Sequence, residues 1–243
     1  MSALLVLDAS GAAISVGLID AENGALLGAE TRPMQRGQVE ALLPMIDAVR
    51  RAAGVEYMQL VAIAATVGPG SFTGIRLGLA AARGVGIATK RPVFGIDSFT
   101  AQFVSLQAER PHLPETILIL LDSKRQDLFV QAMDARGTAL TPPQVLPPEA
   151  VRALADRLAA ERPGPLLVIG DTGMLPALDG IVAERVSSGP PSIAALAAHS
   201  AALWRAARAE GGSLPAASPL YLRAPDAVIP TGGGVLPHLR PIA

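Results

Sequence analysis

The hydrophobic and polar positions at the start of the chain predict three short strands. Residues 3–8 (ALLVLD) form an apolar run that ends in a turn signal, and residues 13–20 place apolar side chains at every second position. The pair Asn23-Gly24, a strong hairpin signal, then leads into a third run at residues 25–31. We therefore expect the chain to open as an antiparallel meander.

The pattern then changes from a strand period to a helical one. Between residues 38 and 53 an apolar stripe, which includes Leu42 and Ile46, lies opposite charged positions. Pro44 lies inside this segment, so either the stable helix starts near the proline or the helix bends there. Further on, the pattern predicts a buried strand, a second helix, another strand and then a third helix, with the first three at residues 61–66, 72–89 and 92–96.

The second half of the chain repeats the first at an offset of 114 residues. The apolar run ending at Asp8 recurs as the run ending at Asp122, and twelve residues later each copy has another aspartate, Asp20 and Asp134. A strand–turn–strand unit cannot bury its own face, so each copy needs helices to form a layered α/β unit. We expect the first helix, the strand at 61–66 and the later helix to recur at residues 149–160, 166–171 and 192–210. The alternative is that two unrelated hairpins look alike.

The repeat predicts a duplicated α/β fold, in which each half is a mixed sheet that opens with antiparallel strands and is packed by helices. We expect the halves to comprise residues 1–105 and 106–228. Residues 229–243 contain a glycine run followed by prolines, and we expect them to form a flexible tail.

Composition narrows the classes of function. Half of the residues are hydrophobic, and 20 basic against 21 acidic residues leave a net charge of −1, which disfavours binding to nucleic acid by bulk charge. The absence of Cys excludes disulfides, Cys-ligated metals and thiol nucleophiles. The chain has no signal-peptide pattern and no uncharged apolar run of the ~18 residues that a membrane helix needs. We therefore expect a cytoplasmic protein that does not contact a membrane.

The most distinctive stretch, residues 66–76, joins a buried strand to a helix and places Ser71 as the helix N-cap. Free amides at Gly68, Gly70 and Ser71 could hold an anion at the helix N-terminus. Asp8, at the end of a strand, could hold a Mg²⁺-bound nucleotide. The alternatives are a tight strand-to-helix turn for the loop and an ordinary turn-forming role for Asp8.

Small residues recur at every fourth position of the second helix, at Gly74, Gly78, Ala82 and Gly86. Because a glycine inside a helix costs about 0.5–1 kcal/mol relative to alanine, this stripe indicates close approach of another backbone. Most of the remaining helix surface is apolar, and such a helix must be buried on both sides. We therefore predict a protein interface on the first and second helices, formed by Leu42, Leu43, Ile46, Ile75, Arg76, Leu79, Ala82 and Arg83. The alternative is that the second half of the chain covers these helices.

The three histidines give little support for hydrolytic or metal chemistry. His112, His199 and His238 have no paired spacing, and the chain contains no His-x-x-x-His pair. A Ser-His-Asp triad is disfavoured because these histidines read more readily as solvent-facing or packing residues. We predict no catalytic residue and no metal ligand.

Several segments resemble the TsaB family, also called YeaZ, whose members are described as glycoprotease or M22-peptidase homologues. The string GPGSFTGIR at residues 68–76 is the most specific match. The other matches are ALLVLDAS at the start, LLPMI at 42–46, LDSKRQDLF at 121–129 and PLYLRAP at 219–225. Gln38, where relatives have His, and residues 126–128, where Gly-Glu-Val is usual, depart from the family without touching any predicted chemistry.

The resemblance implies an actin-like duplicated fold of the ASKHA, ribonuclease H-like class. It implies a non-catalytic scaffold in the formation of N6-threonylcarbamoyladenosine beside the anticodon of tRNAs that read ANN codons. In that family the paralogue TsaD carries the metal and the transfer reaction, TsaB pairs with TsaD through its N-terminal helices, and the ATPase TsaE docks on the pair. It further implies self-association through the same surface, only indirect contact with tRNA, and no cofactor of its own, with ATP or ADP and Mg²⁺ entering only in the complex.

Three other functions stay open at this point. The first is a degenerate ASKHA ATPase or kinase that uses Asp8 and the loop from Gly68 to Gly74. The second is a metallopeptidase, and the third is a tRNA-binding module.

Overall fold

A computed structural model of the chain describes residues 1–34, 36–170 and 183–223. The first half contains five strands, three α-helices and a short 3-10 turn: β1 (Ala3–Asp8), β2 (Ala13–Asp20), β3 (Leu26–Pro33), α1 (Gln38–Ala52), η1 (Tyr57–Gln59), β4 (Leu60–Gly68), α2 (Phe72–Thr89), β5 (Val93–Asp97) and α3 (Ser98–Glu109). The described part of the second half contains β6 (Thr116–Asp122), β7 (Leu128–Met133), β8 (Gln144–Leu146), α4 (Pro148–Glu161), β9 (Leu166–Gly170), β10 (Glu184–Ser187) and α5 (Ile193–Glu210). The predicted tail at 229–243 lies outside the described residues.

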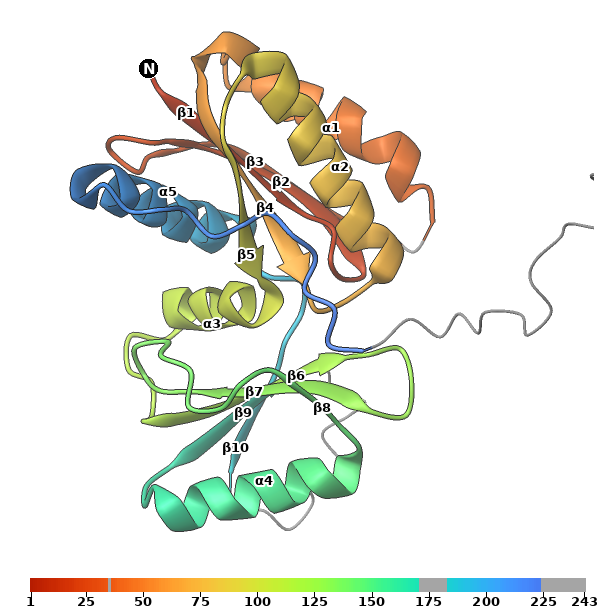
Figure 1. The fold of residues 1–243 in the computed structure, drawn as a ribbon, viewed down its shortest axis with the longest axis vertical. Coiled ribbons are helices and arrows are strands. Elements are labelled where there is room, and N and C mark those ends of the chain that lie inside the picture. Colours follow the sequence, from red (N-terminus) through yellow and green to blue (C-terminus); the bar gives the residue numbers. More distant parts are fainter. Residues whose placement is uncertain (35, 171–182, 224–243) are drawn as a thin grey trace, which may run out of the picture.

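The two halves have the same sheet topology (Figure 1). The first sheet has the order β3-β2-β1-β4-β5 and the second has the order β10-β9-β6-β7-β8. In each sheet the first strand of the half pairs antiparallel with the second strand and parallel with the fourth. The order of each half, third-second-first-fourth-fifth, confirms the predicted duplicated fold of the ribonuclease H-like class.

The repeat is also visible in individual hydrogen bonds. Asp8 Oδ1 accepts from Ser10 N at 3.0 Å, and its counterpart Asp122 Oδ1 accepts from Lys124 N at 2.6 Å. Asp20 and Asp134 likewise each accept from two backbone amides of the turn that follows. The four aspartates that marked the repeat are therefore turn-forming residues at equivalent places.

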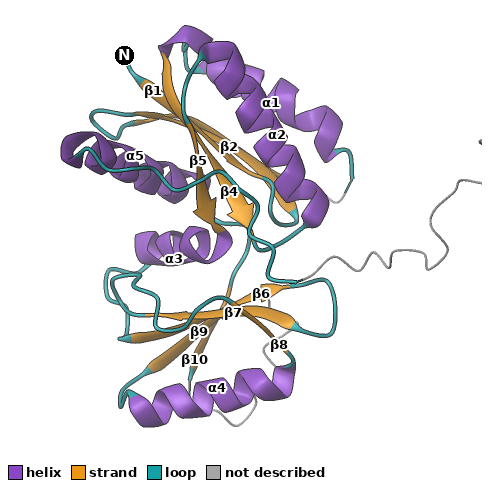
Figure 2. Cartoon of the chain, in the orientation of Figure 1, coloured by secondary structure: helices purple, strands orange, loops and turns teal. Residues whose placement is uncertain are grey.

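The elements stack in five layers (Figure 2). Helices α1 and α2 cover the outer face of the first sheet, α3 and α5 lie between the two sheets, and α4 covers the outer face of the second sheet. Separate apolar cores fill the spaces on the two faces of the first sheet, and a third core lies under α4. Because α5 packs against β1 and β2, the end of the chain returns to the first half.

The observed elements differ from several of the sequence expectations. The boundary expected at residues 105/106 falls inside α3, and α5, expected in the second unit, packs on the first sheet. Strands β8 and β10 were not predicted, because each is a short strand at the edge of its sheet. Since α5 follows β10, its counterpart in the first half is α3, which follows β5. Helix α1 begins six residues before Pro44 and continues through it.

Two glycines of α2 allow a matched test of the packing. An added Cβ at Gly74 would lie 1.9 Å from Ala9 O, whereas one at Gly84 would meet nothing within 4 Å. We expect Gly74→Ala to lower the free energy of unfolding by roughly 2–3 kcal/mol through overpacking. Gly84→Ala should raise it by up to about 1 kcal/mol through helix propensity. Urea unfolding of the two variants checks this, and equal effects would contradict the described packing of α2.

Candidate functional site: the α1–α2 face and the cleft between the sheets

The glycine-rich loop between β4 and α2 packs directly on the turn after β1. Ser71 N donates to Ser10 O at 2.7 Å, and an added Cβ at Gly70 would lie 2.3 Å from the same oxygen. The predicted N-cap is confirmed, since Ser71 Oγ accepts from Gly74 N at 3.2 Å. One of the amides that were expected to face an anion, that of Ser71, therefore forms a hydrogen bond within the fold.

Asp8 is buried beneath this loop, with 2% of its surface exposed. Its Oδ1 accepts three hydrogen bonds, from Ser10 N at 3.0 Å, Ser10 Oγ at 2.7 Å and Thr66 Oγ1 at 2.7 Å. These bonds join the end of β1 to the end of β4. Asp8 thus has a structural explanation that needs no nucleotide, and its role in nucleotide binding stays a prediction.

A cleft of about 230 Å³ lies between the two sheets. Of the four residues proposed for an anion site, Gly70 and Ser71 line this cleft, while Asp8 and Gly68 are buried and do not line it. Lys124 also lines it, and its Nζ is paired with Asp122 Oδ2 at 2.7 Å. The Ser98 hydroxyl is buried at the cleft without a hydrogen-bond partner. The described part of the chain contains no group of three or more His, Cys, Asp or Glu side chains that could hold a metal ion.

A larger and more apolar feature lies between α1 and α2. This groove, called the α1–α2 groove below, has a volume of about 590 Å³ and no charged lining residue. Three of its large side chains are more than half exposed: Val39 by 59%, Leu43 by 56% and Met58 by 68%. The whole lining comprises Val39, Leu43, Tyr57, Met58, Leu77, Ala80, Ala81, Gly84, Val85, Ala88 and Thr89. The described part of the second half of the chain therefore leaves this groove open, although residues 217–221 contact α2 outside it.

Five of the eight predicted interface residues are buried in the isolated chain. They are at most 2% exposed and belong to the core between the helices and the first sheet: Leu42, Ile46, Ile75, Leu79 and Ala82. The small-residue stripe of α2 does mark a close approach, but the approach is to the chain's own β1–β2 turn and β5. Of the predicted set, Leu43, Arg76 and Arg83 are exposed.

Most of the groove lining was not among the predicted residues, because the sequence analysis took the buried small-residue face of α2 as the outer one. The outer lining residues Leu77, Ala80, Gly84 and Ala88 are spaced by three or four residues and would have been found as one helical stripe. The stripe of small residues at every fourth position, through Gly74 and Gly78, faces inward. Both stripes are apolar or small, so the sequence alone does not distinguish them.

Arg76 and Arg83 hold the C-terminal described segment onto α2. The Arg76 guanidinium lies 3.7 Å from the centre of the Phe72 ring, and its Nε donates to the Tyr221 hydroxyl at 2.9 Å. Arg83 Nη2 donates to Ala217 O at 2.7 Å. These contacts place both cations on the side of α2 where residues 217–221 run along it.

The same segment also reaches the second half of the molecule. Arg223 pairs with Asp127, which also accepts from Ser123 Oγ at 2.5 Å. The hydrogen bond from Ser123, together with Arg223, holds the pKa of Asp127 below its ordinary value. The carboxylate of Asp127 is thus engaged in contacts within the chain.

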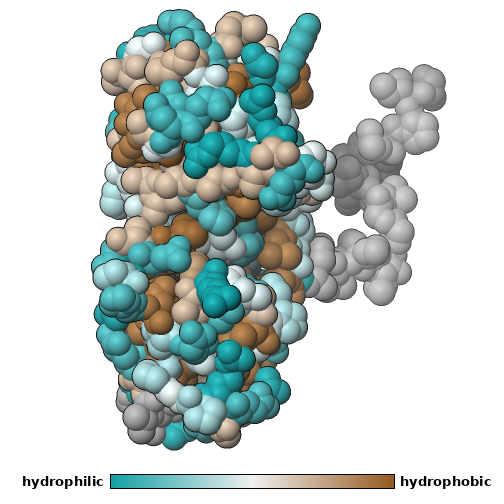
Figure 3. Space-filling model, turned by 90° about the vertical axis from the view of Figure 1, so that its left-hand side faces the viewer, coloured by the Kyte–Doolittle hydropathy of each residue, from teal (hydrophilic) through white to brown (hydrophobic). Residues whose placement is uncertain are grey.

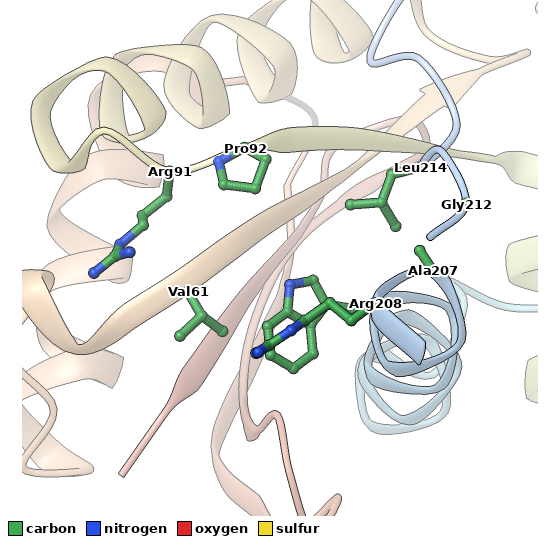
Figure 4. A pocket seen from close by; sticks show the side chains of 8 residues that line it. Val61, Arg91, Pro92, Ala207, Arg208, Gly212 and Leu214 are labelled. Atoms are coloured by element: carbon green, nitrogen blue, oxygen red, sulfur yellow. The ribbon is translucent and has the colours of Figure 1, made fainter. Parts of the chain in front are cut away.

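A further cavity, of about 380 Å³, lies between the start of β5 and the end of α5 (Figure 4). Arg91 and Arg208 border it from different elements. Arg208 lies over the Trp204 ring, 4.6 Å from its centre, and 3.8 Å from Glu22 Oε1, so its charge has partners. The cavity brings together no set of groups that suits a particular reaction.

The histidines that the structure describes are not brought together. His112 lies in an exposed loop, and His199 lies on α5, where burial lowers its pKa against an opposing effect of Asp97. His238 lies outside the described residues.

The side of the molecule that faces the viewer in Figure 3 shows apolar residues interspersed with hydrophilic ones. Among the described helices, none has both the length and the apolar character needed to cross a membrane.

The comparisons with known proteins agree with one another on the family to which the chain is similar. Residues 32–170, more than half of the chain, match the family model described as TsaD, tRNA N6-adenosine threonylcarbamoyltransferase. A tRNA N6-adenosine threonylcarbamoyltransferase of Erythrobacter litoralis is 35% identical over 100 residues, which are 40% of this chain and 29% of that protein. The tRNA threonylcarbamoyladenosine biosynthesis protein TsaB of Haemophilus influenzae is 33% identical over 129 residues, 52% of this chain and 51% of that protein. The chain therefore spans about half, or less, of the length of these two curated relatives.

A solved structure matches over nearly the whole chain. YeaZ from Pseudomonas aeruginosa superposes with a TM-score of 0.73 at 26% sequence identity, covering 91% of this chain and 100% of that one. The shared architecture thus includes both sheets and is not limited to the half that contains the groove.

The internal repeat supplies a control for the role of Asp8. We expect Asp8→Ala to lower the free energy of unfolding by roughly 2–4 kcal/mol, because it leaves three buried donor groups without their acceptor. Asp122→Ala removes the equivalent carboxylate, whose hydrogen bonds within the described part of the chain are to Lys124 alone, and should lower the free energy of unfolding by about 1 kcal/mol or less. Urea unfolding compares the two. Equal losses would contradict the structural role of Asp8.

Proposed function

The chain belongs to the TsaB (YeaZ) family, and on that premise we propose that it serves in the formation of N6-threonylcarbamoyladenosine in tRNA, as the non-catalytic subunit that binds a TsaD-type transferase. The observation that carries this proposal is the α1–α2 groove. It is apolar, open and built on helices whose inner faces are fixed by the core. A surface of this kind is typical of a protein–protein contact.

Covering the exposed side chains of the groove favours a protein partner, and the sequence resemblance to the transferase suggests that this partner has a similar fold. Val39, Leu43 and Met58 each expose more than half of their surface to water. Covering the exposed part of such a side chain contributes on the order of 1 kcal/mol. The transferase relative named above resembles this chain in sequence, so two related folds can pair through equivalent helical faces, as two copies of one chain do in a symmetric dimer.

The remaining parts of the proposal follow from the family. We propose that a TsaE-type ATPase docks on the pair, that a second copy occupies the groove when the transferase is absent, and that tRNA is contacted only through the complex. The place of action is the cytoplasm, and ATP or ADP with Mg²⁺ enters only in the complex. The contribution of this subunit is to stabilise the active arrangement of its partner.

The rival ATPase or kinase hypothesis predicts nucleotide binding by the isolated chain. The buried and fully engaged Oδ1 of Asp8 argues against it. Titration calorimetry with ATP and Mg²⁺ separates the two, because micromolar binding that is lost in Asp8→Asn would favour the rival.

Leu43 offers the sharpest test of the groove. Leu43→Glu places a charge on an exposed position, so it should change the free energy of unfolding by less than about 0.5 kcal/mol. In the complex the same charge would be buried without a partner. We therefore expect the affinity for the TsaD-type transferase of the same organism to fall by at least about thirtyfold, as measured by biolayer interferometry.

Leu26→Glu is the matched control. Leu26 is also an exposed leucine, 48% exposed, but it lies on β3 and does not line the groove. It should leave the affinity unchanged. Unchanged binding by Leu43→Glu, or equal losses in both variants, would contradict the proposal that the groove is the contact surface.

A further inference from the structure

The charged residues beside the α1–α2 groove are distributed unevenly. Helix α2 contains no acidic residue, and Arg76, Arg83 and its C-cap Lys90 are exposed at intervals of seven residues. Seven residues are close to two helical turns, so Arg76 and Arg83 lie on one side of α2 about 10 Å apart, and Lys90 follows at the C-terminal end of the helix. Each is next in sequence to a residue that lines the groove, Leu77, Gly84 or Thr89. We call these three residues the cationic row.

Two acids of α1 and η1, Asp47 and Glu56, are already paired with arginines. Asp47 pairs with Arg50 at 2.9 Å and with Arg51 at 2.5 Å, and Arg50 also pairs with Glu56 at 3.2 Å. The hydrogen bond from Arg50, with the charge of Arg51, holds the pKa of Asp47 below its ordinary value. This network contains two cations and two anions, so it leaves the cationic row without compensation.

The cations of the row have only neutral partners in the described part of the chain. Arg76 contacts the Phe72 ring and the Tyr221 hydroxyl, and Arg83 donates to a backbone carbonyl. Lys90 forms a backbone cap but no ion pair among the described residues. With Glu40 as the one further acid on α1 and Glu56 as the N-cap of η1, the helices α1, α2 and η1 and their caps present a net charge of +2.

A symmetric dimer would oppose this charge to itself. In a two-fold interface each copy presents the same patch, so a net positive face always meets a net positive face. An acidic face on a different protein instead gains attraction at the same positions. We propose that the partner that fits the α1–α2 groove carries acidic residues opposite the cationic row, and that this charge favours it over a second copy of the chain. The inference rests on the proposed function and specifies how the partner is selected.

The adjoining groove indicates that the occupant is a protein and not RNA. Nucleic acid would use the row through its phosphates and would leave the exposed side chains of Val39, Leu43 and Met58 uncovered. An amphipathic protein surface with an acidic margin covers both features together.

The test neutralises two members of the row. Arg83→Gln with Lys90→Gln removes two charges, and the glutamine at 83 retains an amide donor for Ala217 O. Arg136→Gln with Arg162→Gln is the control, since it removes the same number of charges from exposed positions in the second half. The association rate constant with the TsaD-type transferase of the same organism is measured by interferometry at 50 and 300 mM NaCl.

Charges at the margin of an interface act mainly on the association rate and on its dependence on salt. For the Arg83 and Lys90 variant we expect a rate about three- to tenfold lower than that of the control at 50 mM NaCl, with the difference shrinking at 300 mM. We expect its self-association, measured by sedimentation, to tighten by about two- to tenfold.

Three outcomes would overturn the inference. Equal rates for the two double variants, or weaker self-association of the first, would remove the selective role of the row. A gel shift of tRNA with the isolated wild-type chain that the first variant abolishes would make the row an RNA surface. Binding that Leu43→Glu abolishes but the row variant leaves unchanged would overturn this inference alone, whereas a wild-type chain that binds no transferase overturns the proposed function as well.

Discussion

The close contact between α2 and the turn after β1 determines most of what this molecule can do. Gly70 and Gly74 let the start of the helix approach the backbone of Ala9 and Ser10 to distances that no Cβ would allow. Ser71 fixes the same junction twice: its hydroxyl caps the helix, and its backbone N–H donates a hydrogen bond to Ser10 O. Because the inner face of α2 is held in this way, its other apolar face has to point outward. The glycine-rich loop is therefore needed for the fold, and the chemistry first suggested by its sequence is secondary.

The charge of the surface around the α1–α2 groove is set by the side chains that have no ion-pair partner among the described residues. On α1 and η1 the acids and arginines satisfy one another, and along α2 the arginines turn toward the aromatic and carbonyl groups of residues 217–221. The centre of the face is left apolar, and its margin is left positive. An apolar centre with a charged margin is the arrangement in which burial supplies affinity and charge supplies selectivity.

The sequence predicted the architecture far better than the site. Strand and helix periods, turn residues and the repeat at Asp8 and Asp122 located nearly every long element, and the bounds expected for α2 agree with those observed. These features are local, so they can be recognised in short windows. The orientation of α2 depends on a contact with Ala9, more than sixty residues away in sequence, and its two faces are similarly apolar. That is why Leu79 and Ile46 were assigned to the interface although they belong to the core, and why Met58 and Leu77 were missed.

Duplication offers an internal argument for where the function lies. Both halves build the same five-stranded sheet and cover its outer face with helices, so the fold itself does not favour one half. Helix α4 has an ordinary polar outer surface, with Arg152, Asp156 and Arg157 exposed above a buried stripe. Helix α2 occupies an outer layer too, yet it exposes alanine, glycine and isoleucine along its length. A surface helix that retains apolar residues where its setting permits polar ones indicates a constraint that folding does not impose. Because both halves have the same sheet topology, the fold does not require the outer surfaces of α2 and α4 to differ. We therefore attribute the exposed apolar residues of α2 to a partner.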